Sequence, residues 1–147
     1  MSDPNLERVE TTLAELATLK KRKQRPNRFH ARDLLIGLGA RILADEDAEP
    51  PELDKVRQAT EAFGEDWERA VADELSLACT EHVQGVDPRF LDLPNFDFAY
   101  LVAARERLEA RFRAVEALGL AVQEDLLQRV AEADRRAEPY LRDEEGA

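Results

Sequence analysis

The chain has 147 residues, of which 44% are hydrophobic and 36% are charged. A chain of this length buries roughly two-thirds of its unfolded surface, so a hydrophobic core is expected and wholesale disorder is excluded. The 32 acidic and 21 basic residues give a formal net charge of −11. This acidity argues against binding of nucleic acid or anionic membranes by the protein as a whole.

Cysteine content and hydropathy bear on the compartment. Cys79 is the single cysteine, so an intramolecular disulfide is excluded and a reducing compartment is expected. No apolar run approaches the roughly 18 residues that span a membrane, and the start lacks the apolar segment of a signal peptide. The sequence therefore predicts a cytoplasmic protein. Arg outnumbers Lys by 17 to 4, a bias that favours a bacterial origin.

The first expected helix covers about residues 4–23. Asp3 is a suitable N-cap, and Pro4 fits the first helical position because its missing N–H would be unpaired anyway. Apolar residues recur at spacings of three and four and form one stripe, which ends where the positive charge begins.

The second expected helix covers about residues 28–44, with Asn27 as its N-cap. Its apolar residues cover more than one face, which favours a central, buried position. Gly37 and Gly39 each cost up to roughly 1 kcal/mol relative to Ala inside a helix. A close approach of another helix would account for both glycines.

Helical periodicity continues beyond an acidic linker at residues 45–51. An apolar stretch with two prolines, residues 86–95, is expected to be irregular and to pack against the core. The short turn near Gly119 predicts that the last two helices are antiparallel neighbours, and Pro139 is expected to end the last one. No strand-like alternation is present. The four further helices are expected at about residues 52–63, 66–84, 96–118 and 121–137.

These elements predict an all-α fold, a compact bundle of about five or six helices with a C-terminal antiparallel helix pair. We expect one helical domain over residues 1–147, divided into an N-terminal helix with a basic end (1–25), the acidic linker (45–51), a main helical body (52–138) and a tail (139–147). The predicted core contains Leu34, Trp67, Leu75, Phe98, Leu108 and Phe112.

A basic segment at residues 20–32 is the most conspicuous local feature. It holds seven of the 21 basic residues and no acid, whereas the other 134 residues carry a net charge of −18. Such segregated charge suits a partner-binding surface. The seven cations are Lys20, Lys21, Arg22, Lys23, Arg25, Arg28 and Arg32.

The basic segment has several interpretations, which the sequence leaves open. Cations at a helix C-terminus stabilise the helix through its dipole, and they also neutralise acidic helices packed beside them. Alternatively, the segment binds an acidic protein partner or the phosphates of nucleic acid. Phe29 is its only aromatic residue, so a platform for stacking single-stranded bases has little support.

Signals for metal binding or catalysis are weak. Cys79 and His82 lie one helical turn apart, which is usable ligand spacing, but no second such pair supplies further ligands. A small core cysteine beside a polar histidine at a helix end is the more usual explanation of this pair. Gly37-Leu38-Gly39 follows no strand and lacks a third glycine, so a phosphate-binding loop is not expected. We therefore predict no cofactor, no metal and no catalytic residue.

Taken together, the patterns favour a non-catalytic protein–protein interaction or regulatory protein. Its partner is expected to be acidic and to bind the basic segment. A nucleic-acid-associated protein that binds through residues 20–32 is the alternative. The apolar stripes of the first and fifth helices suit packing within the bundle, with a homodimer seam as the other interpretation.

Overall fold

A computed structural model describes residues 3–44 and 49–146, which form seven helices and no strand. The expected all-α class is confirmed. Residues 45–48 of the expected acidic linker lie outside the described residues. Among those described, no helix is both long and apolar enough to cross a membrane. The helices are α1 (Pro4–Lys21), α2 (Arg28–Ala44), α3 (Leu53–Glu61), α4 (Glu65–Gly85), α5 (Pro88–Leu91), α6 (Phe98–Ala117) and α7 (Glu124–Gly146).

Side-chain caps fix the start of the first two helices where the sequence placed them. Asp3 Oδ1 accepts a hydrogen bond from the Asn5 amide at 2.9 Å, and Pro4 opens α1. Asn27 Oδ1 accepts from the Phe29 amide at 3.0 Å and so caps α2. These caps satisfy amide groups that have no partner inside the helix.

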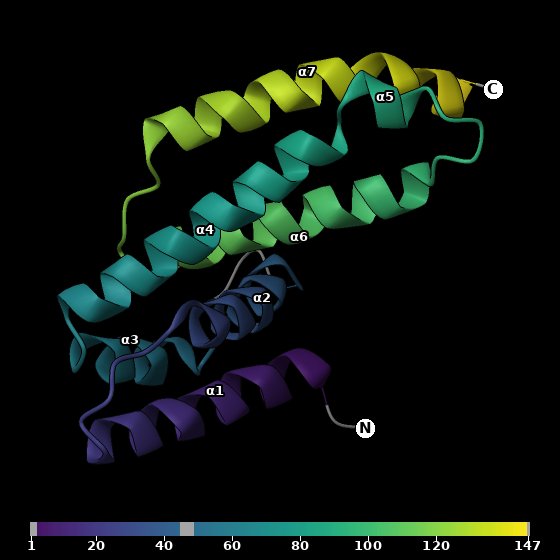
Figure 1. Cartoon of the computed structure of the whole chain (residues 1–147). Coiled ribbons are helices and arrows are strands. Elements are labelled where there is room, and N and C mark those ends of the chain that lie inside the picture. Colours follow the sequence, from purple (N-terminus) through teal and green to yellow (C-terminus); the bar gives the residue numbers. More distant parts are fainter. Residues whose placement is uncertain (1–2, 45–48, 147) are drawn as a thin grey trace.

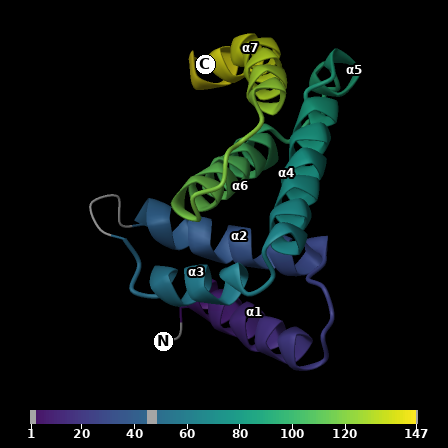
Figure 2. The same cartoon turned by 90° about the vertical axis from the view of Figure 1, so that its left-hand side faces the viewer.

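The middle of the molecule is α2. It packs against α1 on one side and α6 on the other, and it also contacts α4. Figures 1 and 2 show α1 and α7 at opposite ends of the molecule, with α2, α4 and α6 between them. Leu34, Leu35 and Leu38 of α2 are fully buried. The apolar residues on several faces of α2 are thereby covered, as expected for a central helix.

Gly37 and Gly39 lie at the closest helix contacts of α2. A β-carbon at Gly37 would approach the Asn5 carbonyl oxygen of α1 to 2.9 Å, and one at Gly39 would approach the Ala110 carbonyl oxygen of α6 to 1.9 Å. Gly37 therefore lets α2 contact α1 closely, and Gly39 lets it contact α6 closely. The structure thus contains the close helix–helix contacts that we expected from two glycines inside a helix.

The core divides into two clusters. The larger one joins α1, α2, α3, α4, α6 and the start of α7. It holds five of the six predicted core residues, all buried: Leu34, Trp67, Leu75, Leu108 and Phe112. The sixth, Phe98, is half-buried and packs against a smaller cluster formed by the ends of α4 and α6 with α5 and α7.

The last two helices pair less closely than expected. They run in opposite directions (Figure 1), but α7 packs chiefly against α4 and touches α6 less extensively, through the cluster of Leu101, Ala133 and Ala137. Leu126 and Val130 of α7 join the same cluster as Ala78 and Cys79 of α4. The chain also leaves α6 at Ala117 and re-enters a helix only at Glu124. This longer connection lets α7 reach over α4.

Two helix boundaries differ from expectation because of proline. Pro139 does not end the last helix; it lies inside α7, which continues to Gly146. The carbonyl group that loses its amide partner belongs to Arg135, four residues earlier, and Arg135 and Pro139 are both exposed, so water can satisfy it. Pro88 instead begins a helix, α5, capped by Asp87, inside the stretch expected to be irregular. This extra helix brings the number within the described residues to seven.

The stretch around α5 packs down only in part. Val86 and Leu91 are buried, as expected for apolar residues in this segment. Phe90 and Leu93, however, remain exposed. Apolar side chains are therefore left on the surface at this end of α4.

Candidate functional site

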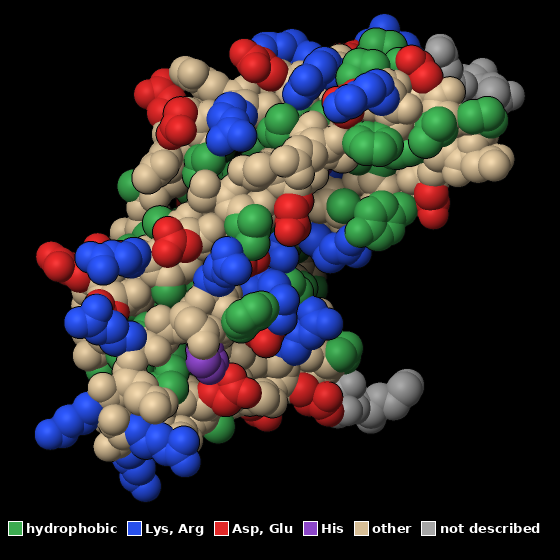
Figure 3. Space-filling view, viewed as in Figure 1, with side chains coloured by type: hydrophobic (Ala, Val, Ile, Leu, Met, Phe, Trp, Pro, Cys, Tyr) green, Lys and Arg blue, Asp and Glu red, His purple; other side chains and the backbone are tan. Residues whose placement is uncertain are grey.

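The basic segment surrounds the turn between α1 and α2. Lys20 and Lys21 occupy the last turn of α1, and Lys23 has a left-handed backbone with φ of +56°. The Gln24 amide donates to the Leu19 carbonyl at 2.9 Å, which closes the helix end in the manner of a Schellman motif. Figure 3 shows Lys and Arg side chains gathered at the lower left, where this turn lies.

We term the first five cations of the segment, Lys20, Lys21, Arg22, Lys23 and Arg25, the basic tip. All five are exposed. Arg25 lies 3.5 Å from Asp66 of α4, but the other four form no ion pair with any described residue. Lys20 and Lys21 are well placed to stabilise the C-terminus of α1 through its dipole. Direct neutralisation of neighbouring carboxylates, by contrast, is limited to the Arg25 contact.

The remaining two cations of the segment belong to α2. Arg28 and Arg32 lie beside the ring of Phe29, with guanidinium carbons 6.0 and 5.1 Å from its centre. Phe29 itself is 57% exposed, and Arg32 also pairs with Asp33 at 3.2 Å. The basic tip therefore continues along α2 to an exposed aromatic ring with two guanidinium groups beside it.

A buried ion pair joins α4 and α6, two helices that pack against α2. Arg111 of α6 lies 3.5 Å from Glu74 of α4, and their side chains are 15% and 5% exposed. Burial raises the pKa of Glu74, while the charges of Arg111, Arg32 and Arg28 lower it by less. Burial likewise lowers the pKa of Arg111. The charges of α2 and α6 thus act on one buried carboxylate of α4, although these residues are distant in sequence.

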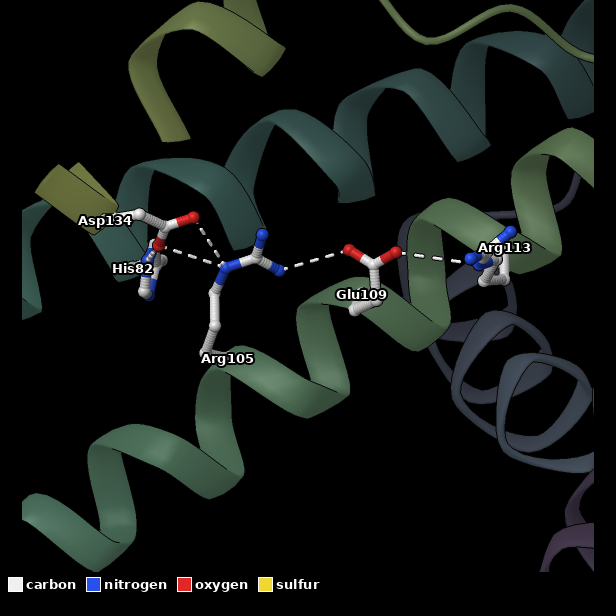
Figure 4. A network of polar contacts seen from close by, with 5 residues as sticks. All are labelled: His82, Arg105, Glu109, Arg113 and Asp134. Atoms are coloured by element: carbon white, nitrogen blue, oxygen red, sulfur yellow. Dashed lines mark hydrogen bonds and ion pairs between the residues drawn. The ribbon is translucent and has the colours of Figure 1, made fainter. Parts of the chain in front are cut away.

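A second polar network links α4, α6 and α7 (Figure 4). Asp134 of α7 accepts from His82 Nε2 at 3.1 Å and from Arg105 Nε at 3.0 Å. Arg105 also pairs with Glu109 at 3.3 Å, and Glu109 with Arg113 at 3.6 Å. Arg105 is the residue that interrupts the apolar stripe of α6. Through its ion pair with Asp134 it forms a polar connection between α6 and α7. His82 Nδ1 is buried and has no hydrogen-bond partner among the described residues.

Two pockets meet at His82. The larger, of about 690 Å³, is a groove between α6 and α7 whose apolar residues include Leu101, Val102 and Leu141. The smaller, of about 350 Å³, lies between α4 and α6. We term this smaller one the aromatic pocket; its principal lining residues are Glu81, Phe90, Phe96, Tyr100, Arg107 and Arg111. Both volumes are in the range of about 300–1,000 Å³ that is common for ligand sites.

The aromatic pocket contains residues that sequence reasoning missed. Tyr100, Arg107 and Arg111 are spaced by seven and four residues, so they share one face of α6. This stripe was a usable signal, but it was masked by the adjacent apolar stripe of α6, whose Leu101 and Leu108 also line the pocket. Its combination with Phe90 and Phe96 depends on how the chain returns from α4 to α6, which the sequence pattern did not indicate.

Cys79 and His82 are not brought together as a reactive site. Cys79 is fully buried, and burial raises the pKa of its thiol to about 11. His82 is directed to Asp134 of another helix. Within the described residues, no group of three or more His, Cys, Asp and Glu side chains is arranged to share a metal ion.

Comparison of the chain with protein-family models, with curated proteins and with solved structures found no match.

Proposed function

We propose that this protein is a non-catalytic interaction or regulatory protein that binds an acidic protein partner through the basic tip, extended along α2 by Arg28 and Arg32. The observation that carries the proposal is the concentration of exposed cations at the α1–α2 turn, four of which have no ion-pair partner among the described residues.

The composition of this surface supports a protein interface. Arg and aromatic residues are enriched in such interfaces and supply much of their binding energy. Phe29 offers an exposed ring directly beside Arg28 and Arg32. The cations would attract the partner, and burial of the ring would add apolar contact area.

The charge of the remaining chain favours protein over nucleic acid. Outside residues 20–32 the chain carries a net charge of −18. A long polyanion would be repelled by this acidic body wherever the two lie within a Debye length, about 8 Å at physiological salt. A folded protein with a local acidic patch can contact the tip without meeting the same repulsion.

Affinity capture from the native cell extract tests the proposal. The first bait is the wild-type chain, and the second carries Gln at the five positions of the basic tip. The matched control carries Gln at five other exposed cations, Lys55, Arg69, Arg129, Arg135 and Arg136. Both variants lose five positive charges, and Gln preserves helix propensity.

The wild type and the control variant are expected to retain the same acidic protein, which salt should release by screening, whereas the tip variant should not retain it. Capture of that protein by the tip variant would remove the basic tip from the proposal. Recovery of a nucleic acid whose binding is lost in the tip variant and persists without protein would support the alternative function.

A further inference from the structure

The aromatic pocket has a mixed chemistry that the proposed function does not use. It lies between α4 and α6, and Phe90 of α5 and Phe96 of the following loop contribute to its wall. A flat apolar group and an anionic group therefore find complementary walls in the same cavity.

Aromatic rings form the apolar part of the wall. Phe90 and Tyr100 are 47% and 65% exposed, and Phe96 is half-buried. Large rings with this much exposed surface gain from contact with another ring, both by loss of water-exposed apolar area and by stacking. These three rings come from α5, the next loop and α6.

Two guanidinium groups form the cationic part. The Arg107 guanidinium carbon lies 5.7 Å from the centre of the Tyr100 ring, so charge and ring are adjacent. Arg111 has an incomplete set of partners. Its ion pair with Glu74 spans 3.5 Å, beyond the length of a strong charge-assisted hydrogen bond, and its buried Nε atom has no partner among the described residues.

The charges around the pocket fit a single negative charge. Arg107 and Arg111 line it, as does one carboxylate, Glu81, while Glu74 offsets part of the Arg111 charge from below. Because two cations and two carboxylates balance, the site has no surplus of positive charge to hold a doubly charged phosphate. Guanidinium groups also bind planar carboxylates in a bidentate manner.

We propose that the aromatic pocket binds a small aromatic carboxylate, with its ring against Phe90, Phe96 and Tyr100 and its carboxylate at Arg107 and Arg111. The pocket volume of about 350 Å³ suits a ligand with one or two fused rings. This inference does not depend on the basic tip, and either proposal can fail without the other.

Isothermal titration calorimetry of the full chain with naphthoate measures binding to the pocket. Naphthyl methanol serves as the uncharged analogue. The variants are Arg107→Gln and Tyr100→Ala, both at exposed positions where folding should survive and can be checked by circular dichroism. The matched control is Arg113→Gln, which removes the same charge from an exposed position of α6 outside the pocket.

Saturable one-site binding of naphthoate is expected, weakened about tenfold by Arg107→Gln because a charge-assisted hydrogen bond is lost. Tyr100→Ala should weaken binding similarly by removing a stacked ring. Arg113→Gln and the tip variant should bind like wild type, and naphthyl methanol should bind about tenfold more weakly. Absence of saturable binding, or equal affinities for wild type, Arg107→Gln and Tyr100→Ala, would overturn the proposal.

Discussion

Gly39 of α2 and Ala110 of α6 meet backbone to backbone, and a β-carbon added at Gly39 would lie 1.9 Å from the Ala110 carbonyl oxygen. The obstacle is backbone, which cannot move aside as the end of a flexible side chain could. This contact joins two helices that contribute heavily to the larger core cluster, so its loss should be felt throughout the molecule.

Gly39→Ala should therefore destabilise the protein, although Ala is the better helix former by about 1 kcal/mol. Overpacking typically costs about 1–3 kcal/mol, and a backbone clash should place this substitution at the upper end or beyond. Urea unfolding followed by circular dichroism measures the change. Gly85→Ala is the control, since a β-carbon there would meet nothing within 4 Å. Equal midpoints for the two variants would contradict the close contact.

Glu74 should make stability depend on pH in a way that Glu74→Gln removes. Burial raises the pKa of Glu74 above its ordinary value of 4.5, so the folded state holds this proton more tightly than the unfolded state does. The stability that protonated Glu74 contributes is fully present below pH 4.5. It is lost as the pH rises through the raised pKa that Glu74 has in the folded state. Gln remains neutral throughout. The free energy of unfolding of Glu74→Gln relative to wild type should thus increase as pH rises from about 4 and then level off.

Denaturant titrations of both proteins across this pH range provide the measurement. A constant difference between them would mean that Glu74 titrates alike in the folded and unfolded states. A relative free energy of unfolding that decreases as pH rises would mean that the charge of Arg111, only 3.5 Å away, affects the pKa of Glu74 more than burial does.

Asp134→Ala should loosen α7. The substitution removes the acceptor of both His82 Nε2 and Arg105 Nε. Because the network is partly exposed, we expect a loss of about 1–2 kcal/mol, with faster amide hydrogen exchange in α7 than in α2. Arg113→Ala, which loses one 3.6 Å contact at an exposed position, should change stability by less than about 0.5 kcal/mol. Unchanged exchange in α7 would show that its apolar face alone holds it.

Cys79 should resist thiol reagents in the folded protein. The thiol is fully buried, and its pKa of about 11 leaves little of the reactive thiolate at neutral pH. Labelling with a chromogenic disulfide should be slower by about a hundredfold or more than in denaturant. Rapid labelling of the native chain would indicate that α4 and α7 separate frequently, since α7 packs against α4 here.

Much of the local structure could be predicted from the sequence because its causes are local. Asp3 and Asn27 cap their helices through amides a few residues away. Helical spacing of apolar residues identified the long helices, and the number of apolar faces identified α2 as central. Pro139 was misread because proline usually ends a helix, whereas an exposed position lets the helix continue past it.

The parts that sequence could not predict arise from contacts between distant residues. Nothing local to α7 indicates that it packs more extensively on α4 than on α6. The basic tip is visible in the sequence because its five cations lie within six successive residues, 20–25. The aromatic pocket was missed because Phe90, Tyr100 and Arg111 come together only once α5 and the next loop have redirected the chain.

The central position of α2 has a consequence for synthesis on the ribosome. α2 emerges early, yet the surface against which Gly39 packs belongs to α6 and is completed only when Ala110 has been made. Until then the leucines of α2 lack one of their covering helices, and the nascent chain carries an uncovered apolar helix. During that interval the uncovered apolar surface of α2 favours chaperone binding and aggregation.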